Sequence, residues 1–284
     1  MNIAVTGGSG RLGRVLVDQL ISHGHTVRSL DRVTPPESQA AMLALPSPSP
    51  LSFADVDMNQ LDNVIEALRG VDAVIHLAAF PGPFGHPPGL VYSNNTIISH
   101  NVLNAASTLD IRKICLASSI NAIGHLASKV GRYDYFPVDE RHPSYNEDDY
   151  SLSKWVLEQQ ADSFARRNHD LTISSLRFSG LPDEPVVPDD GPLTTKEEGR
   201  ARGLWSWTLI GEAARACELA IQADFKGHEV FYIVAPRTSS AHPSLELVQH
   251  AYPDVPIRGD ISGHRSLFDS SKAGRLLGWF HADV

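Results

Sequence analysis

A tyrosine and a lysine stand four residues apart, at Tyr150 and Lys154. If this segment is helical, both side chains lie on one face. A free phenol is a poor base at neutral pH, but a neighbouring ammonium favours the phenolate and lowers its pKa. Tyr150 can then take a proton from a substrate hydroxyl as hydride leaves its carbon, or return one to a carbonyl. The pair Ser118 and Ser119 ends an apolar run upstream, where Ser119 would hold the same oxygen. The pattern predicts Ser119, Tyr150 and Lys154 as catalytic residues.

A glycine-rich segment, residues 6–13, follows the first apolar run of the chain and precedes a predicted helix at 14–22. Gly7 permits a tight turn, Gly10 a close approach of the backbone to a ligand, and Gly13 close packing of the helix. A strand, a glycine loop and a helix in this order predict a site for the pyrophosphate of a dinucleotide. Lys154 would then also bind the nicotinamide ribose, and an oxidised nicotinamide would help to lower the pKa of Tyr150.

Asp31 ends the second predicted strand, 25–30, close to the ~20-residue offset at which a carboxylate meets the adenosine ribose. A carboxylate there repels a 2′-phosphate, so the sequence favours NAD as the cofactor. Arg11, Arg28 and Arg32 are near in sequence, and an arginine can receive that phosphate, so NADP remains possible.

The elements that must position these residues alternate along the chain with short connections. Predicted strands are 3–5, 25–30, 51–55, 73–77, 114–117, 173–177 and 229–234, the third of them after a Pro/Ser-rich loop at 46–50. Predicted helices are 14–22, 61–68, 94–109, 150–167 and 211–222, with two short ones near the C-terminal end. Near-continuous apolar strands separated by helices predict an α/β, doubly wound parallel sheet of Rossmann type, with ligands at the carboxyl ends of its strands.

The amino-acid composition of the chain changes after residue 180. Residues 182–203 are rich in Pro, Asp, Glu and Gly without a clear period, which predicts a long loop. We therefore expect a dinucleotide-binding Rossmann domain at 1–180 and a small C-terminal substrate-binding cap at 181–284, interleaved with the sheet.

Composition excludes several classes of function. With 24 Lys and Arg against 33 Asp and Glu, and no basic stripe, a nucleic-acid partner is not expected. No apolar run reaches membrane-spanning length and no leader is evident, so we expect no membrane contact and a cytoplasmic location. Cys115 and Cys217 are expected to be buried, free thiols, and the 13 histidines show no zinc-type spacing, so no metal is expected.

With these motifs, residues 1–180 resemble the extended short-chain dehydrogenase/reductase family, also called the epimerase/dehydratase family. The resemblance rests on the glycine loop, the strand end at 76–79, the serine pair with Gly124 behind it, and the Tyr150/Lys154 pair. It implies that Ser119 is the catalytic serine. The predicted cofactor contacts are Gly7, Gly10, Arg11, Leu12, Gly13, Asp31, Arg32, Asp55, Val56, Leu77, Ala78, Ala79, Asn95, Ala117, Tyr150, Lys154 and Phe178.

Departures from the family pattern bear on the substrate. Nucleotide-sugar epimerases of this family usually carry an asparagine after the sixth strand, where this chain has Ser179-Gly180, and their caps are longer. The short cap and the segment 202–207 are more similar to uronate dehydrogenases, which oxidise a hexuronate at C1 to a lactone. There an arginine at the position of Arg202 grips the substrate carboxylate, although Ile120-Asn121 replaces their typical Asn-His. The predicted substrate contacts are Ser119, Asn121, Ser179 and Arg202.

Other residues are expected near the pocket or the cap. Residues 80–84 and His125 would flank the pocket, while Trp205 and Trp207 would anchor the cap, with one of them facing the pocket.

The main hypothesis is an NAD(P)-dependent oxidoreductase that acts on a secondary alcohol or hemiacetal of a small polar substrate, a sugar or sugar acid. Alternatives are a redox-neutral sugar epimerase with retained NAD and an NADP-linked carbonyl reductase. A dinucleotide-sensing regulator would have lost the catalytic residues, which are present. The resemblance also implies a homodimer through the helices at 94–109 and 150–167. These helices carry more apolar residues than one buried stripe each requires: Ile97, Ile98, Val102, Leu103, Trp155, Val156 and Leu157.

Overall fold

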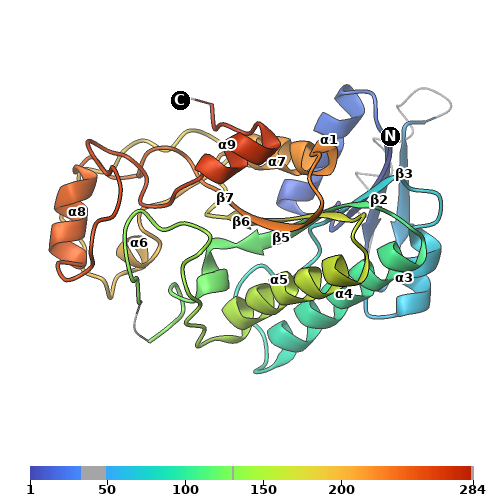
Figure 1. The fold of residues 1–284 in the computed structure, drawn as a ribbon, viewed down its shortest axis with the longest axis horizontal. Coiled ribbons are helices and arrows are strands. Elements are labelled where there is room, and N and C mark those ends of the chain that lie inside the picture. The colour runs from blue at the N-terminus through green and yellow to red at the C-terminus, as the bar shows by residue number, and fades with distance from the viewer. Residues whose placement is uncertain (33–48, 130, 283–284) are drawn as a thin grey trace.

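A parallel sheet forms the centre of the molecule. The computed structural model describes residues 1–32, 49–129 and 131–282 (Figure 1), so most of the predicted loop at 46–50 lies outside the described residues. The strands are β1 (Asn2–Thr6), β2 (Thr26–Asp31), β3 (Leu51–Asp55), β4 (Ala73–His76), β5 (Lys113–Ser119), β6 (Thr172–Phe178) and β7 (Gly227–Ile233). Their order is β3-β2-β1-β4-β5-β6-β7, and every pairing is parallel. The predicted doubly wound α/β fold is confirmed.

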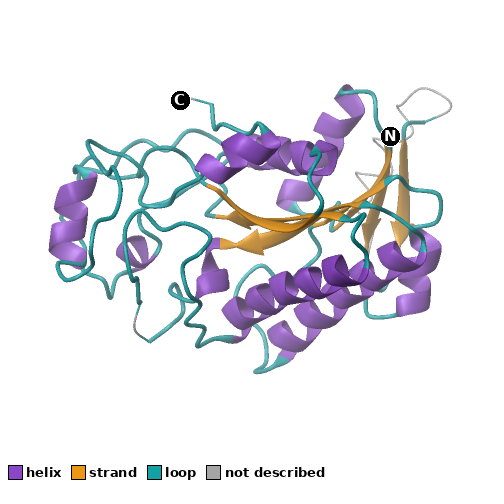
Figure 2. Ribbon diagram, in the orientation of Figure 1, coloured by secondary structure: helices purple, strands orange, loops and turns teal. Residues whose placement is uncertain are grey.

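Helices cover both faces of the sheet (Figures 1 and 2). On one face lie α1 (Arg11–Ser22), α7 (Ile210–Gln222) and α9 (Ser271–Leu277); on the other lie α3 (Leu61–Ala67), α4 (Leu90–Thr108) and α5 (Asp149–Arg167). Alternate residues of β1 supply the two cores: Ile3 and Val5 pack under α1 and α7, whereas Ala4 packs toward α4 and α5. Because successive strand residues point to opposite faces, a strand with both faces covered must be apolar throughout.

Three predicted boundaries near the site differ from the structure by two or more residues. The helix predicted at 14–22 begins at Arg11, directly after Gly10, and the helix predicted at 94–109 begins at Leu90. Strand β5 runs two residues beyond the predicted 114–117, because the backbones of Ser118 and Ser119 continue to pair with β6. Serine is polar and was therefore assigned to the strand end, but backbone pairing does not depend on an apolar side chain.

A third apolar core lies beyond the strand ends and forms the cap. It contains α6 (Gly199–Arg202), α8 (Ser244–Ala251) and the 3₁₀ helix η1 (Ile120–Ile123). Its buried side chains come from 120–138 as well as from 201–268; they include Ile123, Phe136, Leu204, Tyr252 and Phe268. The segment between β5 and α5 is therefore part of the cap, while α7, β7 and α9 return to the sheet. The division at residue 180, with a cap interleaved with the sheet, stays a prediction.

Two sequence features have simple structural outcomes. Cys115 and Cys217 are fully buried, free thiols, as predicted. Among the described residues, none of the helices combines the length and apolar character that crossing a bilayer requires.

Candidate active site

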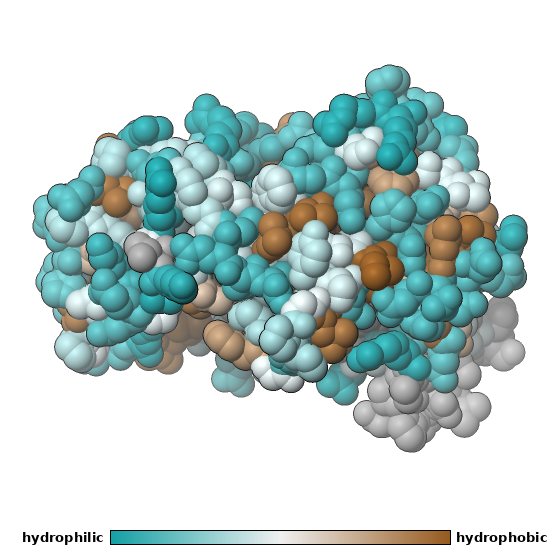
Figure 3. Space-filling model, turned by 90° about the horizontal axis from the view of Figure 1, so that it is seen from below, coloured by the Kyte–Doolittle hydropathy of each residue, from teal (hydrophilic) through white to brown (hydrophobic). Residues whose placement is uncertain are grey.

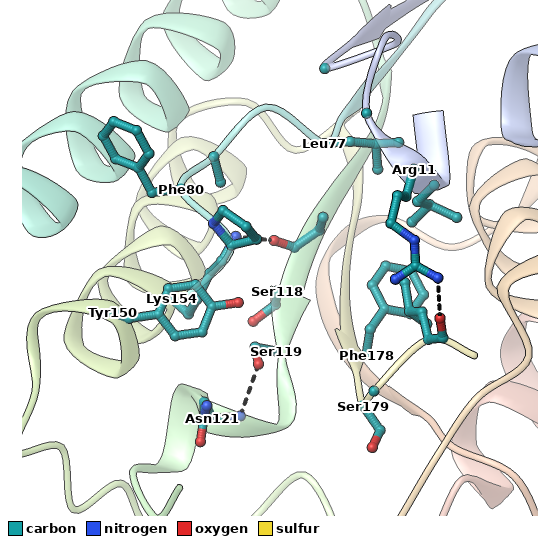
Figure 4. A pocket seen from close by; sticks show the side chains of 18 of the residues that line it. Arg11, Leu77, Phe80, Ser118, Ser119, Asn121, Tyr150, Lys154, Phe178 and Ser179 are labelled. Atoms are coloured by element: carbon teal, nitrogen blue, oxygen red, sulfur yellow. Dashed lines mark hydrogen bonds between the residues drawn. The ribbon is translucent and has the colours of Figure 1, made fainter. Parts of the chain in front are cut away.

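One cavity of about 830 Å³ lies at the carboxyl ends of the strands (Figure 4). It is walled by the glycine loop after β1, the ends of β2, β5 and β6, the segment after β4, and the first turns of α5. It brings together most of the predicted site residues: Gly7, Gly10, Arg11, Leu12, Gly13, Asp31, Arg32, Leu77, Ala78, Ala79, Ala117, Ser119, Asn121, Tyr150, Lys154, Phe178 and Ser179. Residues far apart in sequence meet here because parallel strands place all their carboxyl ends at one edge.

The glycine loop is packed so closely that side chains are excluded. Gly7 has φ +70°, and a Cβ there would lie 2.7 Å from the backbone N of Ala78. A Cβ at Gly13 would lie 2.2 Å from the carbonyl O of Gly7. The loop therefore runs directly against the first turn of α1, whose N-terminal residues line the cavity. Amide groups at a helix N-terminus favour an anion, so this cradle fits the pyrophosphate of a dinucleotide.

The carboxylate of Asp31 is held at the cavity wall by two backbone amides, those of Ser9 (3.1 Å) and Arg32 (2.8 Å). Of the nearby arginines, Arg28 donates to the carbonyl oxygens of Ala67 and Arg69 and does not line the cavity. The Asp31 carboxylate therefore lines the cavity beside the glycine loop, and its contact with the adenosine ribose stays a prediction.

Two further arginines line the cavity. Arg11 donates to the carbonyl O of Leu181 (3.0 Å) and forms an ion pair with Asp183 (3.1 Å). The guanidinium of Arg32 lies 5.8 Å from the centre of the Phe80 ring. Arg11 thus already has an anionic partner, and Arg32 adjoins the carboxylate of Asp31.

Ser119, Tyr150 and Lys154 lie together at the other end of the cavity (Figure 4). The carboxylate of Asp148 caps α5 by accepting the backbone amides of Tyr150 and Ser151, both at 2.9 Å. This N-cap begins the helix at the turn that carries Tyr150. The ammonium of Lys154 donates to the carbonyl O of Ala117 (2.7 Å) and lies 5.7 Å from the centre of the Tyr150 ring.

The pKa of Tyr150 departs from the sequence prediction. Burial raises the pKa of Tyr150 above its usual value, a hydrogen bond with Ser119 opposes this rise, and the Asp148 carboxylate adds to it. The prediction of a lowered pKa is thus wrong for the groups of the chain alone, because desolvation of a buried phenolate outweighs the stabilisation they provide. Burial also lowers the pKa of Lys154 to about 8, and the nearby Glu158 carboxylate opposes that change.

Three predicted cofactor contacts do not line the cavity. Asn95 is buried behind its wall, where its amide binds the backbone N (2.8 Å) and O (3.1 Å) of Phe80, a residue that does line it. Val56 packs in the core below α3 and α4, and Asp55 ends the neighbouring strand β3. The segment reaches the cavity three residues later, through Met58 and Asn59. The cofactor contacts of Asp55, Val56 and Asn95 stay predictions, since these residues do not themselves line the cavity.

Arg202, a predicted substrate contact, does not line the cavity. Its guanidinium donates to the carbonyl oxygens of Ser128 (2.8 Å) and Leu126 (3.4 Å) and so holds the cap loop. Arg200, two residues earlier on α6, lines the cavity and forms an ion pair with Asp189. Residues two apart on a helix do not share a face. Arg202 was chosen by its position in the segment similar to uronate dehydrogenases, and the predicted loop gave no information on which arginine faces the cavity.

Of the other residues predicted near the pocket, some line the cavity and others do not. Phe80 and Pro81 line the cavity, but Phe84 is 80% exposed outside it. His125 does not flank the cavity; it is buried in the cap core beside the rings of Tyr133 and Phe268. Of the two tryptophans, Trp205 lines the cavity and Trp207 does not.

Hydrogen bonds fix the predicted substrate contacts Asn121 and Ser179 in the cavity wall. Asn121 is buried; its backbone amide donates to the Ser119 hydroxyl (3.1 Å), and its side-chain oxygen accepts the Leu126 amide (3.2 Å). The hydroxyl of Ser179 bonds to that of Ser206 at 2.7 Å. The residues that line the cavity without having been predicted include Met58, Asn59, Leu126, Arg200, Ser206 and Ser239.

The Rossmann sheet, the glycine cradle and the serine–tyrosine–lysine cluster define an enzyme of the extended short-chain dehydrogenase/reductase type. Residues 3–181 match the NAD dependent epimerase/dehydratase family, and the chain belongs to this family.

Similar proteins catalyse more than one reaction. The UDP-glucose 4-epimerase of Corynebacterium glutamicum is 24% identical, over 100% of this chain and 92% of that protein. A mutated uronate dehydrogenase has a similar structure, with a TM-score of 0.68 and 20% identity over 99% of this chain and 82% of the other. A UDP-glucose-4-epimerase from Stenotrophomonas maltophila, solved with bound NAD, gives a TM-score of 0.72 and 21% identity over 100% and 94%. The structural likenesses, at such identities, are likenesses of fold.

Proposed function

We propose that this protein is an NAD-dependent oxidoreductase that transfers hydride between the cofactor and a secondary alcohol or hemiacetal of a small polar substrate, a sugar or sugar acid. The single observation that carries the proposal is that Ser119, Tyr150 and Lys154 line the same cavity as the glycine cradle. NAD, when bound, supplies the hydride acceptor or donor.

The protein residues would move and hold the proton. The Ser119 hydroxyl accepts the Asn121 amide, so its own proton is directed away from that amide and can be donated to a substrate oxygen. The Tyr150 hydroxyl would take the substrate proton as general base or return it as general acid. Burial raises the pKa of Tyr150 further above neutral, so the phenolate must be stabilised as it forms, and the nearby Lys154 ammonium would supply that stabilisation.

The cofactor preference follows from Asp31. The residues for a dinucleotide are Gly7, Gly10, Gly13 and the first turn of α1 for the pyrophosphate, with Asp31 for the ribose. Because Arg28 donates to backbone carbonyls outside the cavity and the Asp31 carboxylate would repel a 2′-phosphate, NAD is favoured over NADP.

The size of the cavity favours a small substrate. Its volume of about 830 Å³ must hold a dinucleotide and the substrate together, whereas a single drug-sized ligand alone occupies a pocket of roughly 300–1,000 Å³. A second nucleotide would have little room. Arg200 presents a guanidinium at the cavity wall, and a guanidinium binds a carboxylate well. A hexuronate is small and carries a carboxylate.

The test is reduced-nicotinamide absorbance with NAD and with NADP across aldoses, hexuronates and simple secondary alcohols. Growth of absorbance with NAD on a hexuronate supports the dehydrogenase. A redox-neutral epimerase with retained NAD would use the same three residues; it predicts no net absorbance change and interconversion of two sugars on chromatography. An NADP-linked carbonyl reductase predicts activity only with NADPH and a carbonyl substrate.

Arg200 gives a sharper prediction. Replacing Arg200 by Gln is expected to raise KM for a hexuronate about tenfold to a hundredfold, since a hydrogen bond to a charged group contributes about 1.5–3 kcal/mol. KM for a neutral aldose and the affinity for NAD should stay unchanged, as measured by initial rates and by calorimetry. Arg202→Gln serves as the matched control, because its guanidinium binds loop carbonyls instead. An equal rise in KM for both substrates would remove Arg200 from carboxylate binding.

The chain is also proposed to form a homodimer through α4 and α5. Of the apolar residues on these helices, Ile98, Val102, Leu103 and Leu157 pack into the chain's own core. Ile97 and Trp155 remain 46% and 37% exposed, and apolar side chains are visible among polar ones on this lower face (Figure 3). Sedimentation should give a dimer mass at micromolar concentration, and Trp155→Glu should shift it to the monomer. A monomeric wild-type protein would exclude this interface.

A further inference from the structure

A stripe of polar side chains runs along the inward face of α5 at four-residue spacing. It consists of Tyr150, Lys154, Glu158 and Asp162. Residues four apart lie on one helix face, so this stripe faces the sheet. Tyr150 and Lys154 belong to the proposed relay. Glu158, one turn further along, has no part in it and is nevertheless only 2% exposed.

The Glu158 carboxylate connects the helix to two strands. It accepts the Ser118 hydroxyl of β5 (2.6 Å) and a bidentate pair of hydrogen bonds from the Arg177 guanidinium of β6 (2.9 and 2.8 Å). Arg177 in turn donates to the Tyr232 hydroxyl of β7 (3.1 Å). Ser118, Arg177 and Tyr232 are register partners across the three strands. One row of the sheet is thus joined to one turn of α5.

The buried pair of Glu158 and Arg177 is better explained by the position that it gives to α5 than by a contribution to the stability of the fold. A buried ion pair loses so much hydration that replacing it with apolar residues is often neutral or stabilising. A bidentate guanidinium–carboxylate pair, by contrast, is strongly directional. The pair therefore determines where α5 sits on β5. The helix α5 carries Tyr150 and Lys154, and the strand β5 ends at Ser119, so the pair fixes these three residues relative to one another.

The charge of Glu158 also acts on Lys154. Burial lowers the pKa of the Lys154 ammonium, and Glu158 is the group that opposes this change. The other groups near Lys154 are Tyr150 on its own helix and His76 on β4. Burial, aided by the positive charge of Lys154, lowers the pKa of His76 to about 3, so His76 is neutral. Arg177, the partner of Glu158, is the nearby cation on β6.

We propose that Glu158 is a positioning residue of the active site: it seats the helix bearing Tyr150 and Lys154 on the strand bearing Ser119, and it supplies the negative charge that accompanies the buried Lys154 ammonium. The inference rests on the proposed Ser119–Tyr150–Lys154 relay and adds a residue that acts through Lys154.

The test is a direct titration of Lys154 in the protein labelled with ¹³Cε-lysine. The chain has six lysines, and Lys154→Met assigns the resonance. In Glu158→Gln the side chain keeps its size and can still bond to Ser118. The titration midpoint of Lys154 is expected to move down by about one pH unit. The alkaline limb of the pH profile of kcat/KM should move to lower pH with it. The midpoint falls because removing a neighbouring anion destabilises the ammonium form of Lys154.

Asp162→Asn is the matched control on the same stripe. Asp162 bonds to His228 of β7 at 2.7 Å and lies two turns from Lys154. This variant should lower thermal stability and leave the Lys154 midpoint in place. An unchanged midpoint in folded Glu158→Gln would overturn the inference. A shift of equal size in Asp162→Asn would also overturn it, because the effect would then be merely structural.

A second variant keeps the inference testable if Glu158→Gln does not fold. Glu158→Gln leaves the buried Arg177 without its charged partner, which can be strongly destabilising. The double variant Glu158→Leu with Arg177→Met removes both charges, and the Lys154 midpoint should still fall; no fall would overturn the inference. The titration needs neither substrate nor turnover. A shifted midpoint without activity on any substrate would therefore count against the proposed function and leave the role of Glu158 toward Lys154 intact.

Discussion

Replacing Tyr150 by Phe is expected to reduce turnover about a thousandfold while NAD still binds with its wild-type affinity. The substitution removes one hydroxyl and keeps the ring that lines the cavity. General acid–base catalysis by a positioned side chain contributes about 10²–10⁴-fold, and no other phenol lines this cavity among the described residues. Steady-state rates on the best substrate of the panel and calorimetric titration with NAD measure the two quantities separately.

Tyr145→Phe is the matched control for this substitution. The Tyr145 hydroxyl donates to Asp134 (2.9 Å), and the residue does not line the cavity. Loss of that hydroxyl should leave turnover within twofold of the wild type. Unchanged turnover in Tyr150→Phe would remove Tyr150 from the mechanism. A parallel loss of NAD affinity would instead assign it a role in binding.

Replacing Gly13 by Ala is expected to weaken NAD binding at least tenfold and to lower the free energy of unfolding by about 1–3 kcal/mol. The added Cβ would lie 2.2 Å from the carbonyl O of Gly7 and 2.7 Å from the Cα of Gly8. Both are backbone atoms, so the loop itself must move away from α1. The cradle for the pyrophosphate is made of that same loop. Calorimetry with NAD and denaturant unfolding measure the two effects.

Gly211→Ala makes the same chemical change in a helix where space is open. A Cβ at Gly211, in α7, would meet no atom within 4 Å. Because Ala has a higher helix propensity than Gly, this control should be neutral or stabilising by up to about 1 kcal/mol, with unchanged affinity for NAD. Wild-type affinity and stability in Gly13→Ala would mean that close packing of loop on helix is not what the cradle requires.

Much of the fold could be predicted because its signals are local. Apolar runs and helical periods indicated the elements, and the alternation of strand and helix indicated a parallel sheet with its ligand edge. The glycine loop, Asp31, Ser119, Tyr150 and Lys154 could be predicted as site residues because each belongs to a pattern of spacing within or beside one element. The topology then brings them to one cavity.

The residues that escaped prediction lie where tertiary packing decides. The segment 120–138 joined the cap because its apolar side chains meet residues of 201–268, which no local pattern reveals. Arg200 rather than Arg202 reached the cavity because a single turn of helix, α6, formed inside a predicted loop. Asn95 was found by motif, yet it holds the backbone of Phe80 and does not line the cavity.

By itself the sequence determined the order of the elements, and it predicted a dinucleotide cradle and the types of group in the proposed proton relay, since these depend on spacing along the chain. Only the tertiary structure decided how those groups are charged. Burial raises the pKa of Tyr150 and lowers that of Lys154. It also places Glu158 among Ser118 and Arg177 from two separate strands. Desolvation and charge pairing depend on distances through space, which the linear spacing of residues does not contain.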